Sequence, residues 1–219
     1  MNGVIKKFKK KSSSHRQPKI NNSGFTLIEL LVVIAMISVM LAAMVGLFTT
    51  LSKSYTTEEV AANAQQDVRA ATDFMVRDIR MAGVDPTLSG NFGIEDATST
   101  RIRFTMDTET APDAGDYDGS VNDTRFERIT YELNVNQLNQ ILYETTASVS
   151  TQPVIDNVTA LTFTYLDENG ADLGPIVSAA NLPNIREIQL TMTVQLLAGA
   201  KGTVTRTLDT RIQCRNLWF

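Results

Sequence analysis

An unbroken apolar stretch near the N-terminus dominates the hydropathy pattern of the chain. Within residues 30–48 only Ser38 is polar. At 1.5 Å per residue, a helix of this length spans roughly 28 Å, close to the hydrocarbon thickness of a bilayer. The pattern therefore predicts a membrane-spanning helix. Two alternatives are a buried helix of a large soluble domain and the apolar core of a cleaved secretory signal peptide.

After residue 48 the apolar positions narrow to a single face. Six of them recur at spacings of three and four, as in one stripe of an amphipathic helix: Val60, Ala64, Val68, Ala71, Met75 and Ile79. Gly83 is placed to end this helix, and Pro86 prevents it from resuming. We therefore expect one helix over residues 25–82, apolar on all sides in its first half and amphipathic in its second.

Alternating apolar and polar positions replace the helical period in the rest of the chain. They predict strands over residues 101–106, 129–135, 140–144, 161–165, 185–196 and 203–212, with residues 84–100 and 107–124 as loops. A helix followed by strands with no helices between them is typical of an α+β fold with an antiparallel sheet. We expect a long N-terminal helical spine, transmembrane in its N-terminal half, packed through its stripe on that antiparallel β-sheet domain.

The charges are divided between two parts of the chain. Residues 1–24 carry seven basic side chains and no acidic one, whereas the chain from Phe25 onward has a net charge of −11. A basic leader beside an apolar segment favours a cytoplasmic N-terminus, by the positive-inside rule. The acidic body argues against a nucleic-acid partner, because phosphate binding requires clustered Lys and Arg.

The composition also limits the chemistry that the chain can perform. His15 is the only histidine and Cys214 the only cysteine, so the chain after residue 24 has no Ser-His or Cys-His pair and no His/Cys zinc site. No phosphate-binding GxxxxGK[ST] or GxGxxG motif is present. A single cysteine cannot form an internal disulfide, and we expect Cys214 to be a small core residue. The prediction is a protein that is not an enzyme and holds no cofactor.

Glu29 is the one acidic residue at the start of the apolar run. A carboxylate in an apolar segment is costly, although less so at the headgroup level, where it is tolerated without a partner. Alternatively it has a partner. Cleavage after Gly24 would create an α-amine on Phe25, with a positive charge about one helical turn from Glu29. Such a pair, within one helix or between parallel helices, would fix axial register more than it would add stability.

Residues 19–31, with Gly24-Phe-Thr-Leu-Ile-Glu-Leu31 at their centre, resemble the class III leader of type IV pilins and pseudopilins. The resemblance implies cleavage after Gly24 by prepilin peptidase and N-methylation of Phe25. It implies other major and minor pilins as partners, and inner-membrane lipid before assembly. It places the leader in the cytoplasm and the sheet domain in the periplasm, before entry into a pilus or pseudopilus fibre. The family often has a proline where this chain has Gly46, which puts a fixed kink in doubt.

Two further segments narrow the resemblance. Residues 65–86 are similar to the end of the spine helix in PilW-type minor pilins, and residues 156–170 are similar to both that group and the J-type minor pseudopilins of type II secretion. The resemblance implies a minor pilin that primes or supports fibre assembly. The alternatives are a J-type pseudopilin and, from another class, a membrane-tethered extracytoplasmic binding domain. Major pilins commonly close a C-terminal disulfide loop, which one cysteine cannot form.

The expected organisation is a cleaved leader (1–24), an apolar half-helix (25–51), an amphipathic half-helix (52–83) and a globular sheet domain (84–219). The sheet domain contains an acidic loop over residues 107–124, whose carboxylates are a weak candidate for Ca²⁺ binding: Asp113, Asp116, Asp118 and Asp123. Aligned as an EF-hand loop, it has Ala114 first and Arg125 last, where carboxylates are needed. A solvated loop without a metal is therefore favoured.

Overall fold

The computed structural model describes residues 24–108, 117–121, 127–144, 149–199 and 202–217. The chain divides into two compact units, residues 1–48 and 49–219. They are described separately below. Helix α1, Leu27–Arg80, is 54 residues long and has residues in both units. It begins two residues later and ends two residues earlier than the sequence predicted.

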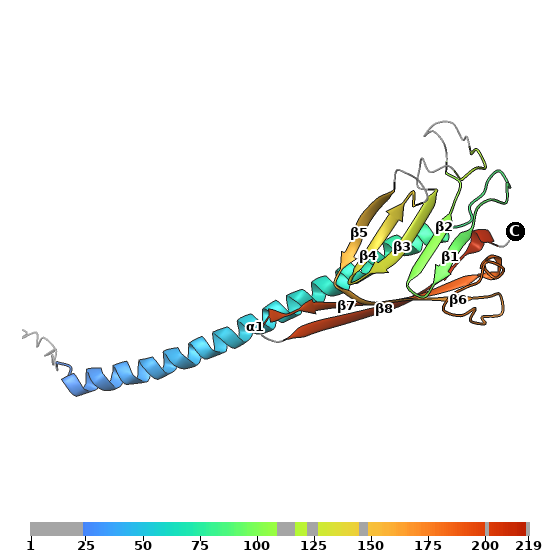
Figure 1. Cartoon of the computed structure of the whole chain (residues 1–219). Coiled ribbons are helices and arrows are strands. Elements are labelled where there is room, and N and C mark those ends of the chain that lie inside the picture. The colour runs from blue at the N-terminus through green and yellow to red at the C-terminus, as the bar shows by residue number, and fades with distance from the viewer. Residues whose placement is uncertain (1–23, 109–116, 122–126, 145–148, 200–201, 218–219) are drawn as a thin grey trace, which may run out of the picture. The chain divides into compact units, whose positions relative to one another are not determined.

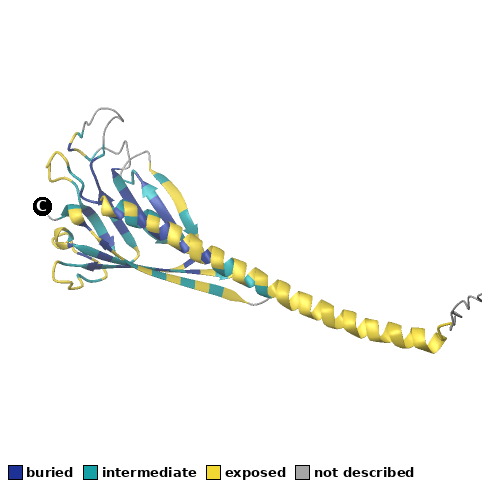
Figure 2. Cartoon of the chain, turned by 180° about the vertical axis from the view of Figure 1, so that it is seen from behind, coloured by how far each residue is buried: buried dark blue, intermediate teal, exposed yellow. Residues whose placement is uncertain are grey.

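The part of α1 in the first unit is exposed along its whole length (Figure 2). Its side chains are almost all apolar, and the helix continues through Gly46. By length and composition this is a helix that can cross a membrane.

The part of α1 in the second unit buries one face. Its buried residues are Ala64, Val68, Ala71, Thr72, Met75 and Ile79. The predicted stripe is thus confirmed from residue 64 onward, whereas Val60 is only half-buried. Gly83 follows the helix with φ +76°, a conformation that favours glycine, and its N–H donates to the Thr105 carbonyl. An added Cβ there would lie 2.5 Å from the Leu217 side chain.

Two antiparallel sheets follow the helix, so the α+β class is confirmed (Figure 1). The first has the order β1-β2-β3-β4-β5, with strands β1 Ile94–Thr98, β2 Arg101–Thr105, β3 Arg128–Asn134, β4 Gln137–Leu142 and β5 Ser150–Asp156. The second has the order β6-β7-β8, with strands β6 Val158–Leu166, β7 Glu187–Leu197 and β8 Thr203–Gln213. Short 3-10 turns η1, Leu182–Asn184, and η3, Arg215–Leu217, complete the described elements.

Two strands were not predicted. Strand β1 lies in a segment expected to be a loop, because a register shift between Ile94 and Asp96 breaks the apolar alternation. Strand β5 is mostly exposed and polar, so no apolar pattern marks it. The turn between β3 and β4 is also shorter than expected, because Val135 adopts φ +57° and only Val135 and Asn136 separate the strands.

One hydrophobic cluster joins the helix to both sheets within the second unit. Met75 and Ile79 of α1, Phe104 and Tyr131 of the first sheet, and Leu190 of the second are all fully buried in it. Cys214, just after β8, also belongs to this cluster, as the sequence predicted. Its thiol is free, and burial raises its pKa to about 12, against a lowering by Arg186.

Candidate functional site

Thr26 starts the apolar helix. Its hydroxyl accepts a 3.3 Å bond from the Glu29 N–H, and its carbonyl accepts bonds from the Glu29 and Leu30 N–H groups. Thr26 therefore caps the helix, and Glu29 stands three residues later, the spacing of a capping box. The carboxylate lies in the first turn, where the helix dipole favours negative charge. The T-x-x-E spacing could have located this helix start from sequence alone.

Gly24 lies just ahead of this cap. A Cβ built on Gly24 would meet no described atom within 4 Å, and Gly24 is not among the glycines with positive φ. The fold of the described chain therefore has no need of a glycine at this position. Phe25, the next residue, is 80 % exposed.

The apolar side chains after Phe25 form a large exposed surface. It is made by residues of every face of the helix, among them Leu27, Leu31, Ile34, Met40 and Phe48. A soluble monomer rarely exposes a contiguous apolar surface of this extent. This half of α1 therefore requires lipid or other apolar helices around it.

The acidic loop is only partly described. Asp113, Asp116 and Asp123 lie outside the described residues, and Asp118 is exposed and accepts a 2.8 Å bond from the Ser120 N–H. Among the residues that the structure describes, no group of three His, Cys, Asp or Glu side chains is arranged to hold a metal ion.

Asp107, at the start of that loop, differs from expectation because it is buried rather than solvated. It is 2 % exposed; its Oδ2 accepts a 3.3 Å bond from the Gly119 N–H, and its Oδ1 has no hydrogen-bond partner among the described residues. Burial raises the pKa of this carboxyl, and the Asp118 and Asp85 carboxylates raise it further, against the bond from Gly119.

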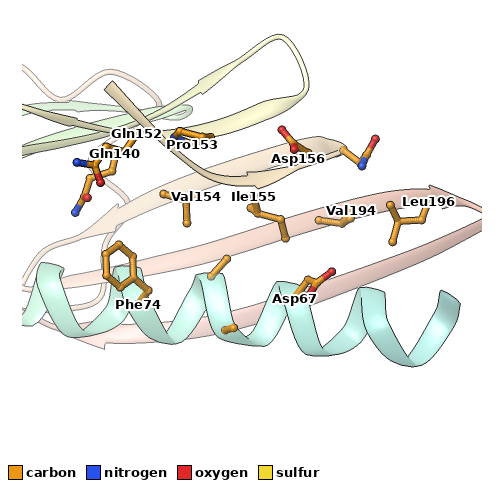
Figure 3. Close-up of a pocket in the computed structure, with 13 residues that line it drawn as sticks. Asp67, Phe74, Gln140, Gln152, Pro153, Val154, Ile155, Asp156, Val194 and Leu196 are labelled. Carbon is orange, nitrogen blue, oxygen red and sulfur yellow. The ribbon is translucent and has the colours of Figure 1, made fainter. Parts of the chain in front are cut away.

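A groove of about 620 Å³ lies between α1 and the edge of the first sheet (Figure 3). Phe74 and Asp67 line it from the helix, residues 152–157 from β5 and the residue after it, and Val194 and Leu196 from β7. Its described lining combines apolar side chains with amides and two carboxylates, Asp67 and Asp156, on opposite walls. This described lining offers no nucleophile with a base beside it.

The face of the first sheet that points away from the hydrophobic cluster carries a network of charges that the sequence did not predict. The Arg101 guanidinium lies 2.6 Å from the Asp96 carboxylate and contacts Glu144, and Arg128 binds Glu95 at 2.9 Å. Burial alone would raise the pKa of Glu144. The hydrogen bond from Thr130 and the charges of Arg101 and Arg103 outweigh it, and the pKa lies below its ordinary value. The network joins β1, β2 and β3 and serves the fold.

Comparison with known families gives two matches along the chain. Residues 19–45 match the prokaryotic N-terminal methylation motif, the segment that contains Gly24, Phe25 and Glu29. Residues 59–214, well over half of the chain, match prepilin peptidase-dependent protein B. No curated protein matches the chain. Proteins of this kind are structural subunits that depend on prepilin peptidase and assemble with other pilins. The chain therefore belongs to the prepilin peptidase-dependent protein B family of type IV pilin-like proteins.

Proposed function

We propose that this chain is a minor pilin of a type IV pilus. Prepilin peptidase cuts it after Gly24 and methylates Phe25, and the mature subunit enters the fibre to prime or support assembly. The observation that carries the proposal is the order of features at one place. A glycine that the fold does not need is followed by the helix cap Thr26, the first-turn acid Glu29 and a fully exposed apolar helix.

The backbone around residue 24 supports cleavage there. The bond between Gly24 and Phe25 lies outside the helix, which begins at Leu27. A peptidase can therefore hold this bond in its active site without first unwinding a helix. A small residue at position 24 suits a narrow site on the enzyme, since nothing in the chain itself selects it.

Glu29 is the proposed register residue. Once Gly24 is removed, the α-amine of Phe25 is the nearest positive charge that the mature chain offers, and methylation keeps that charge. In a bundle of parallel helices, the Glu29 carboxylate of one subunit would pair with the amine of the next. A charge pair in an apolar setting is costly to break, because each partner alone is left desolvated. It therefore selects one axial offset between neighbours.

The proposed topology is a single pass through the inner membrane, with residues 1–24 in the cytoplasm and the sheet domain in the periplasm. The basic leader supports this orientation. Moving the apolar half-helix from lipid into a helix bundle changes its apolar burial little, because both environments are dry. Packing and the Glu29 pair can thus decide where the subunit goes.

A minor rather than a major subunit is favoured by the single cysteine, Cys214, which is buried and free. A structural rather than an enzymatic role is supported by the family match, because proteins of this family are structural subunits. The acidic body of the chain makes nucleic acid an unsuitable partner.

Mass spectrometry of the mature N-terminus, on protein isolated from the native cells, tests the proposal. We expect N-methyl-Phe25 as the first residue. An intact Met1 would overturn the proposal and favour a membrane-tethered domain. The matched variant Gly24→Asp should accumulate as uncut precursor, and a normal mature band from that variant would refute the cleavage site.

Deleting the chain separates the two fibre systems. Loss of surface fibres with normal secretion supports the pilus. Normal fibres with exoproteins retained in the periplasm would instead identify a pseudopilin of type II secretion.

A further inference from the structure

Strand β8 forms an open edge of the three-stranded sheet. It has 11 residues, TVTRTLDTRIQ, and pairs on one side with β7 without any register shift. At about 3.4 Å per residue the edge is roughly 37 Å long. Strands of this length are uncommon at a sheet edge, because their unpaired backbone groups invite another strand to bind.

The ladder determines which backbone groups of β8 point outward. At its two ends, the Ala198 N–H donates to the Gly202 carbonyl and the Cys214 N–H donates to the Arg186 carbonyl. Both bonds continue the register of the strand pair, in which hydrogen-bonded and non-hydrogen-bonded pairs alternate. The even-numbered residues of β8 therefore bond to β7. The odd-numbered ones direct their N–H and C=O groups away from the sheet: Thr203, Thr205, Thr207, Asp209, Arg211 and Gln213.

These outward groups are almost entirely unpaired within the part of the chain that the structure describes. The Thr205 carbonyl accepts a 3.1 Å bond from the Arg206 guanidinium. For the other five residues, the described part of the chain provides no partner to the outward backbone groups. The row of free donors and acceptors repeats every second residue along the strand, and only an extended polypeptide matches that repeat.

The other three outer strands of the two sheets are covered or interrupted. Strand β1 is covered at one end by residues 175–177, through bonds that join Ala97 to Val177 and Ser99 to Pro175. Strand β6 receives Ser99 and Leu173 along its outer side. Strand β5 contains Pro153, which has no N–H, and its register with β4 shifts. Proline and register shifts are devices that protect edges, and β8 has neither proline nor glycine nor lysine.

The side chains of β8 indicate which kind of strand could pair with its open edge. Its outward-bonding residues form an exposed row of threonines and glutamine, with one acid, Asp209, and one base, Arg211. On the opposite face, Val204, Arg206, Leu208 and Thr210 are half-buried and Ile212 is buried. A matching strand is therefore polar with little net charge on one face, and on the other it has both apolar and polar side chains.

We propose that β8 is the docking edge for an extended strand of a neighbouring, different pilin subunit, which adds to the three-stranded sheet by backbone hydrogen bonding. This inference rests on the proposed function, because a fibre subunit always has such neighbours. The occupant is an extended polypeptide segment, and its backbone supplies most of the contact. A long open edge is a liability in an isolated protein, and covering it in the assembly removes that liability.

Photocrosslinking of the full-length chain in its native cells tests the inference. The photoreactive residue p-benzoyl-phenylalanine replaces Thr205 in one strain and Thr162 in a matched control. Thr162 lies on the same exposed face, two strands away across β7, at about 10 Å from β8. We expect an adduct with another pilin subunit from Thr205, at least about tenfold stronger than from Thr162.

A pair of variants tests the backbone contribution. Thr207→Pro removes an outward N–H that the β7 ladder does not use, and an edge strand tolerates proline at such a position. Thr207→Val loses the same hydroxyl but keeps the N–H. The proline variant should lose the Thr205 adduct and the valine variant should keep it. Continued protection of buried Cys214 from maleimide verifies the fold.

Equal adducts from Thr205 and Thr162, or adducts only with a second copy of this chain, would overturn the inference. Should Thr207→Pro fail to fold, the comparison of Thr205 with Thr162 still decides, because it needs no proline. An uncut wild-type precursor would instead refute the proposed function. A processed chain that enters fibres without a Thr205 adduct refutes only the docking edge.

Discussion

The Tyr131 hydroxyl donates a 2.6 Å hydrogen bond to the Asp78 carboxylate, which joins strand β3 to helix α1. Gln140, the cross-strand partner of Tyr131 on β4, donates 3.1 Å and 3.0 Å bonds to Asp78 and to the Tyr131 hydroxyl. The Phe74 ring packs edge-on against Tyr131, with 6.4 Å between centroids. Burial raises the pKa of the Tyr131 hydroxyl and the bond to Asp78 raises it further, so this group stays a donor. The polar contact therefore sets the axial position of the helix against the sheet, which apolar packing alone sets less uniquely.

Tyr131→Phe should lower the free energy of unfolding by about 1–3 kcal/mol, because it removes a buried bond to a charged acceptor. The change keeps the ring and its contact with Phe74. The measurement is thermal unfolding of the full chain in detergent. Tyr55→Phe, on an exposed part of α1, is the matched control and should change little. Equal effects of the two changes would show that the Asp78 bond contributes nothing specific.

Asp107→Asn should stabilise the protein at neutral pH. The pKa of Asp107 is raised in the folded state, so the folded chain holds its proton more tightly than the unfolded chain. The destabilising effect of ionised Asp107 is absent below the unfolded pKa, near 3.8, and grows as pH rises through the folded pKa. Asn keeps an acceptor for the Gly119 N–H but carries no charge.

The gain from Asp107→Asn should appear as a higher free energy of unfolding at pH 7, because the buried charge is removed while an acceptor for the Gly119 N–H is kept. It should shrink as the pH is lowered toward 4. Melting curves at both pH values, with exposed Asp73→Asn as the control, provide the measurement. A gain that is the same at both pH values would show that the charge of Asp107 is not its cause.

Glu144→Gln should lower the free energy of unfolding at neutral pH, the opposite of the effect expected for Asp107→Asn. The pKa of Glu144 is lowered in the folded state, so ionised Glu144 contributes stability above the unfolded pKa, and this contribution is lost as pH falls through the folded pKa. Losing its charge leaves Arg101 and Arg103 without a shared partner. We expect a loss of about 1–3 kcal/mol at pH 7.

Glu132→Gln is the matched control for Glu144. Its carboxylate also faces Arg101, at 3.4 Å, but it is more exposed. Removing that charge should cost no more than about 1 kcal/mol, as for a surface ion pair. Denaturant unfolding of both variants compares them directly, and a larger loss from Glu132→Gln would contradict the assignment of Glu144 as the centre of the network.

The sequence predicted those parts of the fold that repeat a local pattern. The apolar stripe from Ala64 to Ile79 and the paired strands β7 and β8 each extend over many periodic positions. One position that departs from the period therefore changes the prediction little. Strand β1 was not predicted, because its five residues include a register shift, and the alternation of apolar and polar positions does not reveal such a shift. The division of the strands into two sheets was not predicted either, because it depends on which strands pair, and this is decided by contacts between residues far apart in the sequence.

Buried polar groups were predicted least well. In the sequence, Asp107 looks like any other carboxylate of the acidic loop. In the fold it is buried, with its carboxylate bonded by the Gly119 N–H and its own N–H bonded to the Val84 carbonyl. The Tyr131–Asp78 bond joins residues 53 positions apart, so no local pattern marks it. The N-terminal candidate residues Gly24, Phe25 and Glu29 come from a short contiguous motif, and their roles stay predictions. Thr26 was missed there, although its spacing to Glu29 signals a cap.

Cys214 should resist alkylation until the protein unfolds. Burial raises its pKa to about 12, so almost no thiolate is present at pH 8, and the side chain is fully buried. We expect maleimide labelling of the intact chain to be slower than that of the urea-unfolded chain by at least about a hundredfold. Rapid labelling of folded protein would show that the segment after β8 opens readily.

Glu29→Ala should leave cleavage after Gly24 largely intact but lower incorporation into fibres by at least about tenfold, equivalent to about 1.4 kcal/mol in register selection.

The structure offers a competing role for Glu29, as the first-turn acid of a helix capped by Thr26. Thr26→Ala separates the two roles, because it removes the cap and keeps the carboxylate. If Glu29 pairs with a neighbouring Phe25 amine, Thr26→Ala enters fibres nearly as the wild type does, and Glu29→Gln fails as Glu29→Ala does, because both lack the charge. Quantifying the mature subunit in sheared fibres against the membrane fraction measures all three variants. Equal loss in Thr26→Ala and Glu29→Ala would assign Glu29 to starting the helix, and normal incorporation of Glu29→Ala would remove the register argument altogether.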